Sequence, residues 1–435
     1  MEKMNAMNGK LCGCGKVHSF GSQVISGSGV LAQLPDVLRK TNAKRPFLLC
    51  DNNTYKAAGE QVEAILRGSG IAYSCYCYPN GAVTPDEKSV GAAVMHFDKS
   101  CDCILGIGSG VINDIGKILS NITGLPYVIV ATAPSMDGYA SATSSMTRDG
   151  LKISLPSRSA DVVLGDTDIL CTAPVYMLKS GLGDMLAKYV SICEWRISHL
   201  ITGEYYCEEI ANLIRSALKR CVSHADGLLK KEKEAVQAVF DGLVIGGVAM
   251  NYAGLSRPAS GVEHYISHVL DMRAVEFGTP EDLHGIQCAV GTLIAVRLYE
   301  KLKAVRPDRK KALSYVGAFD YDTWAQQLRQ LLGKGAESMI ALEEKERKYD
   351  KQAHAQRLEI ILKNWESILQ IIDEELPLAA EIEKLLDTIG APKTLSQIGT
   401  PDEQLPMIFK ATKDIRDKYV LSRLAWDLGI IEEMV

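Results

Sequence analysis

The first 170 residues alternate short apolar runs with segments in which apolar residues recur every three or four positions. Contiguous apolar residues predict buried strands, at residues 47–51, 72–78, 103–105 and 127–131. Helical spacing predicts helices between them, at residues 61–66, 85–97 and 111–120. Residues 151–156 and 162–166 resemble further strands. This alternation indicates a parallel α/β sheet, whose ligands bind at the carboxyl ends of the strands.

From Pro174 onward the pattern is almost entirely helical. The expected helices cover residues 185–201, 208–220, 231–251, 262–275, 285–304, 381–389 and 405–424. The charged segment 342–369 predicts a solvated surface hairpin. We therefore expect an α/β domain at residues 1–170 and an all-helical domain at residues 171–435.

A glycine-rich turn follows the apolar run at 103–105. Gly106, Gly108 and Gly110 lead directly into the helix expected at 111–120. Because glycine has no Cβ, a phosphate can approach the bare N–H groups at the positive end of that helix. A tight turn without a ligand explains the same glycines, so both interpretations stay open.

Two further strand ends carry polar side chains. Asp51 ends the strand at 47–51 and suits either a ribose diol or the cap of the next helix. The loop at 132–141 joins small hydroxyl side chains to one acid, Asp137. These side chains suit a ligand site, although a turn held by hydrogen bonds from the Asp and Ser side chains explains them as well.

Three of the eight histidines fall within residues 256–284. His264 and His268 are four apart on one expected helix, so they share a face, and His284 begins another helix. With Asp184 at an upstream helix start, they suit a divalent metal bound by two imidazoles and a carboxylate. A helix cap is the simpler interpretation of Asp184 alone.

The composition is that of a folded soluble protein, with 47% hydrophobic and 23% charged residues. The net charge of −5 argues against a nucleic-acid partner, and we expect neither a membrane span nor a secretory signal. Twelve cysteines, several in apolar segments, suit reduced thiols in the cytoplasm. Cys12, Cys14 and His18 resemble half of a metal knuckle, although an ordinary turn explains them as well.

At this point the chain resembles a known family. The motifs run in order as G-x-G-S-G-x-x-x-D from Gly106, T-A-P-S-x-D-G from Thr132, G-x-G-D from Gly181, S-R-P-A-S-G-x-E-H-x-x-x-H from Ser256, and His284-Gly285. They are similar to those of glycerol-1-phosphate dehydrogenases, and most like the bacterial members labelled arabinose-operon proteins. That branch belongs to the superfamily of iron-containing alcohol dehydrogenases, glycerol dehydrogenases and dehydroquinate synthases. The resemblance covers roughly residues 45–430.

The resemblance implies a role for each matching residue. Asp184, His264 and His284 would be the metal ligands, with Asp184 also beside substrate. Asp137 and His268 would hold substrate and take part in catalysis. The implied cofactor residues are Asp51, Gly108, Gly110, Val111, Ile112, Asn113, Asp114, Thr132, Ala133, Pro134, Ser135 and Ser141. Ser109 and Met136 depart from common family residues, without removing a ligand.

The resemblance also implies a reaction, the reduction of dihydroxyacetone phosphate to sn-glycerol 1-phosphate with NAD(H) or NADP(H). The implied metal is nickel or zinc, with ferrous iron chemically suitable, and the implied assembly is a homodimer or larger. Alternatives are a polyol dehydrogenase without phosphate specificity, a dehydroquinate synthase-like lyase and a nucleotide sensor without catalysis. Arg257 is a candidate for the substrate phosphate, or else packs the Arg-Pro turn.

Overall fold

The computed structural model describes residues 2–79 and 83–435, which form two compact units. The first unit joins residues 1–185 to 212–255, and the second joins 186–211 to 256–435. Helices α8 (Val175–Thr202) and α9 (Glu208–Ser223) each run from one unit into the other. The division into domains at residue 170 stays a prediction.

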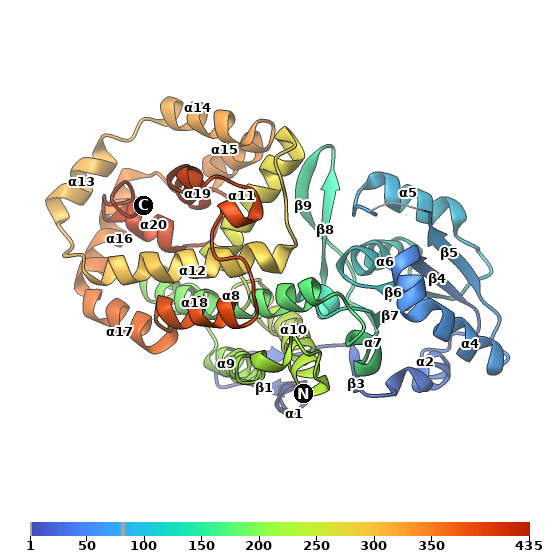
Figure 1. The fold of residues 1–435 in the computed structure, drawn as a ribbon. Helices are drawn as coiled ribbons and strands as arrows, with labels where there is room; N and C mark the ends of the chain where they lie inside the picture. The colour runs from blue at the N-terminus through green and yellow to red at the C-terminus, as the bar shows by residue number, and fades with distance from the viewer. Residues whose placement is uncertain (1, 80–82) are drawn as a thin grey trace. The chain divides into compact units, whose positions relative to one another are not determined.

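The first unit contains a six-stranded sheet in the order β3-β10-β7-β6-β4-β5 (Figure 1). All of its neighbouring strands are parallel. The strands are β3 (Gln23–Gly27), β4 (Pro46–Asp51), β5 (Ser74–Tyr78), β6 (Cys103–Gly108), β7 (Tyr127–Ala131) and β10 (Val162–Asp166). The predicted parallel α/β fold is therefore confirmed, with β3 as an edge strand that the sequence pattern missed.

The sheet is buried because its strands are apolar on both faces, as parallel sheets require. Alternate residues of four strands, such as Leu105 and Ile107 of β6, enter one hydrophobic core. That core also contains Leu34 of α2 (Leu34–Lys40) and Leu66 of α4 (Glu60–Gly68). Helix α6 (Gly110–Thr123) packs on β6, the strand it follows.

The other elements of the first unit are short, with one exception. They are α1 (Glu2–Met7), β1 (Lys10–Leu11), β2 (Val17–His18), α3 (Asn52–Thr54), α5 (Glu87–His96) and α7 (Thr167–Leu170). The exception is α10 (Lys233–Ala253), which is long and apolar enough to cross a membrane. Because 83% of its most apolar window is buried inside the structure, α10 is a core helix.

The segment at 151–156 is a strand, but it lies outside the main sheet. Strand β9 (Leu151–Pro156) pairs antiparallel with β8 (Thr143–Arg148) in a separate hairpin. Asp149 and Gly150 form its turn with φ values of 53° and 72°. Positive φ at both central residues is the geometry that Asp-Gly favours in two-residue hairpins.

The regular elements among the described residues of the second unit are all helices. Besides the ends of α8 and α9 it contains α11 (Val262–Phe277), α12 (His284–Lys303), α13 (Arg309–Gly317), α14 (Tyr321–Leu332), α15 (Gly335–Glu346), α16 (Lys351–Lys363), α17 (Trp365–Glu375), α18 (Ala379–Thr388), α19 (Leu405–Thr412) and α20 (Leu421–Asp427). The expected all-helical C-terminal part is confirmed. The segment at 342–369 is not a solvated hairpin, because Glu343, Tyr349 and His354 are buried.

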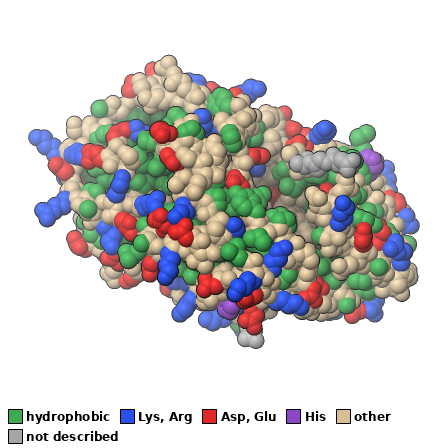
Figure 2. All heavy atoms as spheres, viewed as in Figure 1, with side chains coloured by type: hydrophobic (Ala, Val, Ile, Leu, Met, Phe, Trp, Pro, Cys, Tyr) green, Lys and Arg blue, Asp and Glu red, His purple; other side chains and the backbone are tan. Residues whose placement is uncertain are grey.

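Charges of both signs are mixed over the surface drawn in Figure 2. Acidic and basic side chains alternate there over both units and do not gather by sign. This distribution matches the small net charge of −5.

The contact between α6 and β7 predicts a position that requires glycine. A Cβ at Gly116 would lie 2.5 Å from the Tyr127 hydroxyl oxygen and 2.6 Å from its ring. Because that ring is fully buried, Gly116→Ala should destabilise the protein by about 1–3 kcal/mol in urea unfolding. Gly91→Ala in α5 is the matched control, since nothing lies within 4 Å of its Cβ position. The control should be neutral or stabilising by up to about 1 kcal/mol, and equal losses in both variants would contradict this account.

Candidate active site

The glycine-rich turn joins β6 to α6 as the sequence predicts. Strand β6 ends at Gly108, Ser109 precedes the helix, and α6 begins at Gly110. A Cβ at Gly108 would lie 2.5 Å from the Cβ of Ile112, so no larger residue fits there. The first N–H groups of α6 have no partner within the helix, which makes this end suitable for an anion.

A buried lysine, which the sequence interpretation missed, connects α6 to the loop after β7. The Lys117 ammonium is 2.8 Å from the Asp114 carboxylate and donates to the Gly138 carbonyl oxygen at 3.2 Å and the Ser141 hydroxyl at 3.3 Å. Asn113 also donates to the Gly138 carbonyl, at 3.0 Å. Three predicted cofactor residues are thus brought together. The sequence signal that could have identified Lys117 is its position three residues after Asp114 on a mostly apolar helix.

The loop after β7 lies directly against the glycine-rich turn. The Thr132 N–H donates to the Gly108 carbonyl at 3.1 Å, and the Ser109 and Ser135 hydroxyl oxygens are 2.6 Å apart. The Tyr139 hydroxyl fixes the loop by donating to the Ala133 carbonyl at 2.6 Å. The predicted cofactor residues at 132–135 therefore share one end of the sheet with the turn.

Asp51 at the end of β4 caps the following helix. Its Oδ1 accepts from the N–H groups of Asn53 and Thr54, both at 2.8 Å. The Thr54 hydroxyl accepts from the Asp51 N–H at 2.9 Å, which completes a capping box. Both helix bonds use one carboxylate oxygen, and a contact between the other and a ribose stays a prediction.

Asp137 and Asp184 lie side by side in the first unit. The Asp137 N–H donates to Oδ2 of Asp184 at 2.9 Å. Helix α8 begins at Val175, so Asp184 lies within the helix. The simpler interpretation of Asp184 as a helix cap is therefore wrong. A fully buried carboxylate inside a helix is rare unless it is paired or binds a ligand.

In the second unit, α11 and α12 bring the three predicted histidines together. The ring centroids of His264 and His284 are 5.0 Å apart. His268 lies 6.5 Å from His264 and 6.2 Å from His284 by the same measure. The ligand atoms of His264, His284 and Cys288 lie within 4.8 Å of one another.

Neighbouring side chains fix the orientation of two of these rings. Nδ1 of His264 donates to the Glu263 carboxylate at 2.8 Å. The Ser267 hydroxyl donates to Gln287 Oε1 at 2.6 Å, so its oxygen accepts from Nδ1 of His284 at 3.1 Å. In the neutral rings, Nε2 of both histidines therefore carries a lone pair. Metal-binding histidines are oriented in this way, and the donor set fits zinc, nickel or ferrous iron.

Cys288 adds a soft donor that the sequence interpretation did not single out. Its Sγ lies 3.6 Å from Nε2 of His284. Burial raises the pKa of the Cys288 thiol, but His264 and His284 outweigh burial and leave the pKa below its usual value. Cys288 follows His284 by four residues, so the two side chains lie on the same face of the helix. This spacing is the sequence signal that could have identified Cys288 as a candidate ligand.

Comparison with known proteins identifies the family. Residues 25–174 match the iron-containing alcohol dehydrogenase family. The glycerol-1-phosphate dehydrogenase [NAD(P)+] of Halalkalibacterium halodurans is 33% identical over 294 residues, which are 66% of this chain and 74% of that protein. The chain belongs to the glycerol-1-phosphate dehydrogenase family of oxidoreductases. The enzyme of the same name from Methanosarcina acetivorans is 33% identical over 277 residues, 63% of this chain and 76% of that protein.

Solved structures of the wider superfamily share the fold of this family member. The crystal structure of a probable glycerol dehydrogenase from Sinorhizobium meliloti superposes with a TM-score of 0.60. It covers 96% of this chain and 98% of that one at 17% identity. At this identity the likeness concerns the fold alone.

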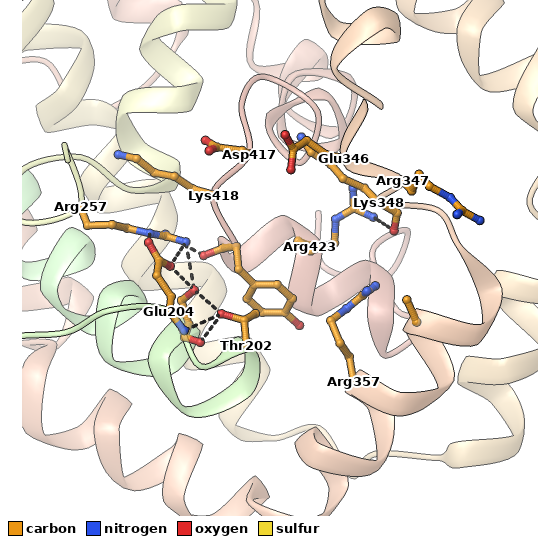
Figure 3. Close-up of a pocket in the computed structure, with 13 residues that line it drawn as sticks. Thr202, Glu204, Arg257, Glu346, Arg347, Lys348, Arg357, Asp417, Lys418 and Arg423 are labelled. Atoms are coloured by element: carbon orange, nitrogen blue, oxygen red, sulfur yellow. Dashed lines mark hydrogen bonds and ion pairs between the residues drawn. The ribbon is translucent and has the colours of Figure 1, made fainter. Parts of the chain in front are cut away.

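Arg257, in the S-R-P-A-S-G motif of the family, packs within the second unit. Its guanidinium donates to Glu204 Oε1 at 2.8 Å, to the Ser198 hydroxyl at 3.0 Å and to the Tyr419 carbonyl at 2.9 Å (Figure 3). Only 2% of the residue is exposed. These bonds occupy all three guanidinium nitrogens, so the structure favours the packing interpretation of Arg257.

Arg257 lines a cavity of about 430 Å³ that is rich in basic side chains. The lining residues are Ser198, Thr202, Glu204, Arg257, Glu346, Arg347, Lys348, Ala353, Arg357, Asp417, Lys418, Tyr419 and Arg423. Burial, together with Arg257 and Arg416, lowers the pKa of Lys418 to about 7. Burial and Arg423 lower the pKa of Lys348 to about 8. The cavity is therefore a costly place for a positive charge.

Lys418 predicts that stability depends on pH above neutrality. Because its folded pKa of about 7 lies below the ordinary 10.5, the unfolded chain binds more protons between these values. Stability therefore rises as the pH rises through that window, by at most about 1.4 kcal/mol per pH unit for one proton. Lys418→Met should flatten this part of a curve of Tm against pH. Lys345→Met, at an exposed site on α15, should leave the slope unchanged, and a slope unaltered by Lys418→Met would contradict the assignment.

Proposed function

We propose that this chain reduces dihydroxyacetone phosphate to sn-glycerol 1-phosphate with NAD(H) or NADP(H) and one divalent metal ion. The observation that carries the proposal is the pair of imidazoles in α11 and α12, each oriented through Nδ1 so that the lone pair of the neutral ring is on Nε2. Relatives named glycerol-1-phosphate dehydrogenase [NAD(P)+] support the substrate and the cofactor.

The metal ligands in this proposal are Asp184, His264 and His284. The chemistry of two imidazoles and a carboxylate suits nickel or zinc, with ferrous iron also suitable. Glu263, and Ser267 through Gln287, hold the two rings in place. Such outer partners raise the basicity of the ligand nitrogen and fix its direction.

The proposed cofactor site is the end of the sheet at β6 and β7. The turn at Gly108 and Gly110 and the start of α6, at residues 111–114, receive the pyrophosphate. The loop residues 132–135 and Ser141 lie along the nicotinamide side. Lys117 supports this arrangement, because it holds Asp114 and Ser141 at fixed positions.

When bound, the metal supplies a Lewis acid that polarises the substrate carbonyl, and the reduced nicotinamide supplies a hydride. Asp137 accepts hydrogen bonds from substrate hydroxyl groups and orients them. The His268 ring delivers a proton to the carbonyl oxygen as it becomes an alcohol.

We further propose a preference for NADH. The Asp51 carboxylate, held by its cap bonds, places negative charge where a 2′-phosphate of NADPH would lie. The ratio of kcat/KM for NADH to that for NADPH tests this preference, and a ratio below one would contradict it.

The proposed enzyme is a cytoplasmic homodimer or larger oligomer. A reducing compartment suits a chain with twelve cysteines. Sedimentation at micromolar concentration tests the assembly, and one species of 47.4 kDa would contradict it.

Substrate choice separates this function from its alternatives. Cofactor oxidation should be fast with dihydroxyacetone phosphate and at least tenfold slower with dihydroxyacetone. Equal rates would identify a polyol dehydrogenase without phosphate specificity. No turnover with either compound, across zinc, nickel and ferrous iron, would favour a dehydroquinate synthase-like lyase or a nucleotide sensor.

His264→Ala or His284→Ala should abolish turnover and lower the metal content, since a site with three protein ligands cannot lose one and stay intact. Elemental analysis of the purified variants measures the metal per chain. His96→Ala, on the exposed surface of α5, is the matched control and should keep both metal and activity. Full metal occupancy in both active-site variants would refute the ligand assignment.

His268→Ala should keep the metal and lose activity. General acid–base groups contribute on the order of 10²–10⁴ in rate, and a loss in that range is expected in kcat. The pH profile of kcat should also lose the limb that the imidazole contributes. If metal is lost, His268 is itself a ligand. Normal turnover would show that it is only a helix residue.

A further inference from the structure

Residues 2–20 form a small structure outside the proposed active site. Strands β1 and β2 pair antiparallel, with Lys10 opposite His18 and Leu11 opposite Val17. The turn between them is closed by the Cys12 N–H, which donates to the Lys16 carbonyl, and the Gly15 N–H, which donates to the Cys12 carbonyl, each at 2.9 Å. Gly15 has φ of 82°, which a glycine adopts without strain. This turn holds Cys12 and Cys14 close together.

His18 faces this turn with one nitrogen fixed. Only 1% of the residue is exposed. Its Nδ1 lies 2.9 Å from the Tyr252 carbonyl oxygen. Because a carbonyl oxygen only accepts, Nδ1 carries the proton, and Nε2 of the neutral ring has a lone pair. That Nε2 lies 3.4 Å from Sγ of Cys14. This is the same outer-partner arrangement that orients a metal-binding histidine.

The distances fit a tetrahedral metal site. The ligand atoms of Cys12, Cys14 and His18 lie within 4.8 Å of one another. Zinc bonds of about 2.3 Å to sulfur and 2.0 Å to nitrogen separate tetrahedral ligand atoms by about 3.5–3.8 Å. Two thiolates and an imidazole are soft and borderline donors, which select zinc over magnesium or calcium. These three side chains leave one position for a further donor.

We propose that Cys12, Cys14 and His18 bind a structural zinc ion that fastens the N-terminal hairpin to α10. A hairpin with two residues in each strand is too small to be stable alone. The hairpin is tied to α10 through His18 and the Tyr252 carbonyl, and the preceding helix α1 is tied to the same residue because the Tyr252 hydroxyl donates to the Met4 carbonyl at 2.8 Å. Binding replaces the two thiol protons with the ion and involves no change of oxidation state.

The experiment removes the proposed catalytic metal so that only this site is counted. The full chain carrying His264→Ala and His284→Ala is purified, dialysed and analysed for zinc. About one zinc per chain is expected, falling to near zero when Cys14→Ser or His18→Ala is added. Cys75→Ser, at an exposed cysteine of β5, is the matched control and should keep the zinc. Absence of zinc from the parent variant, or zinc unaffected by Cys14→Ser and His18→Ala, overturns the proposal.

Thiol protection provides a second measurement on the unmodified protein. Cys12 and Cys14 are half-buried, so iodoacetamide reaches them when no ion is bound. Mass spectrometry should show slow labelling of both, and labelling at least tenfold faster after chelation. A rate that chelation does not change, or labelling that requires a reductant, would mean a simple thiol–imidazole contact or a disulfide and would overturn the zinc site. Neither result depends on catalytic activity, so the proposed function is tested separately.

Discussion

The buried ammonium of Lys117 is the interaction on which the cofactor end of the sheet depends. An isolated charge inside a protein is costly, so it must be surrounded by acceptors. Here the acceptors include the Asp114 carboxylate, the Gly138 carbonyl and the Ser141 hydroxyl. These groups come from α6 and from the loop after β7. One desolvated cation therefore sets the spacing between the glycine-rich turn and the hydroxyl-rich loop, and the geometry of the proposed phosphate site depends on it.

The histidines in both compact units show how a ring becomes a directed donor. His264, His284 and His18 each give Nδ1 to an acceptor that is itself held: a buried carboxylate, a hydroxyl already donating elsewhere, and a backbone carbonyl. The fixed tautomer places the lone pair of the neutral ring on Nε2 in all three. The acceptor thus matters as much as the histidine, since without it the ring could rotate or change tautomer. Histidine spacing alone cannot show this, because the partners are identified by contacts.

The sequence predicted those parts of the fold that depend on continuous apolar runs. Strands β4, β6 and β7 are buried on both faces and were placed to within a few residues. Strand β3 was missed because Ser26 and Gly27 weaken the pattern at a sheet edge, where half the surface is not packed. Of the hairpin, strand β9 was predicted and strand β8 was missed, although Asp149-Gly150 marks the turn between them. Asp184 was placed at a helix start because the polar and glycine residues before it disguise a helix that begins at Val175.

The candidate site shows why a structural and a functional interpretation of one residue need not exclude each other. Asp51 caps a helix, as its position after β4 suggested, yet both cap bonds fall on a single oxygen. The capping box holds the carboxylate in place, and the proposed preference for NADH relies on that fixed position. Arg257 is the contrasting case, because its three nitrogens are all occupied within the protein. A polar residue can bind a ligand only through atoms that its contacts within the folded protein do not already occupy. A sequence motif gives the residue type but not these contacts.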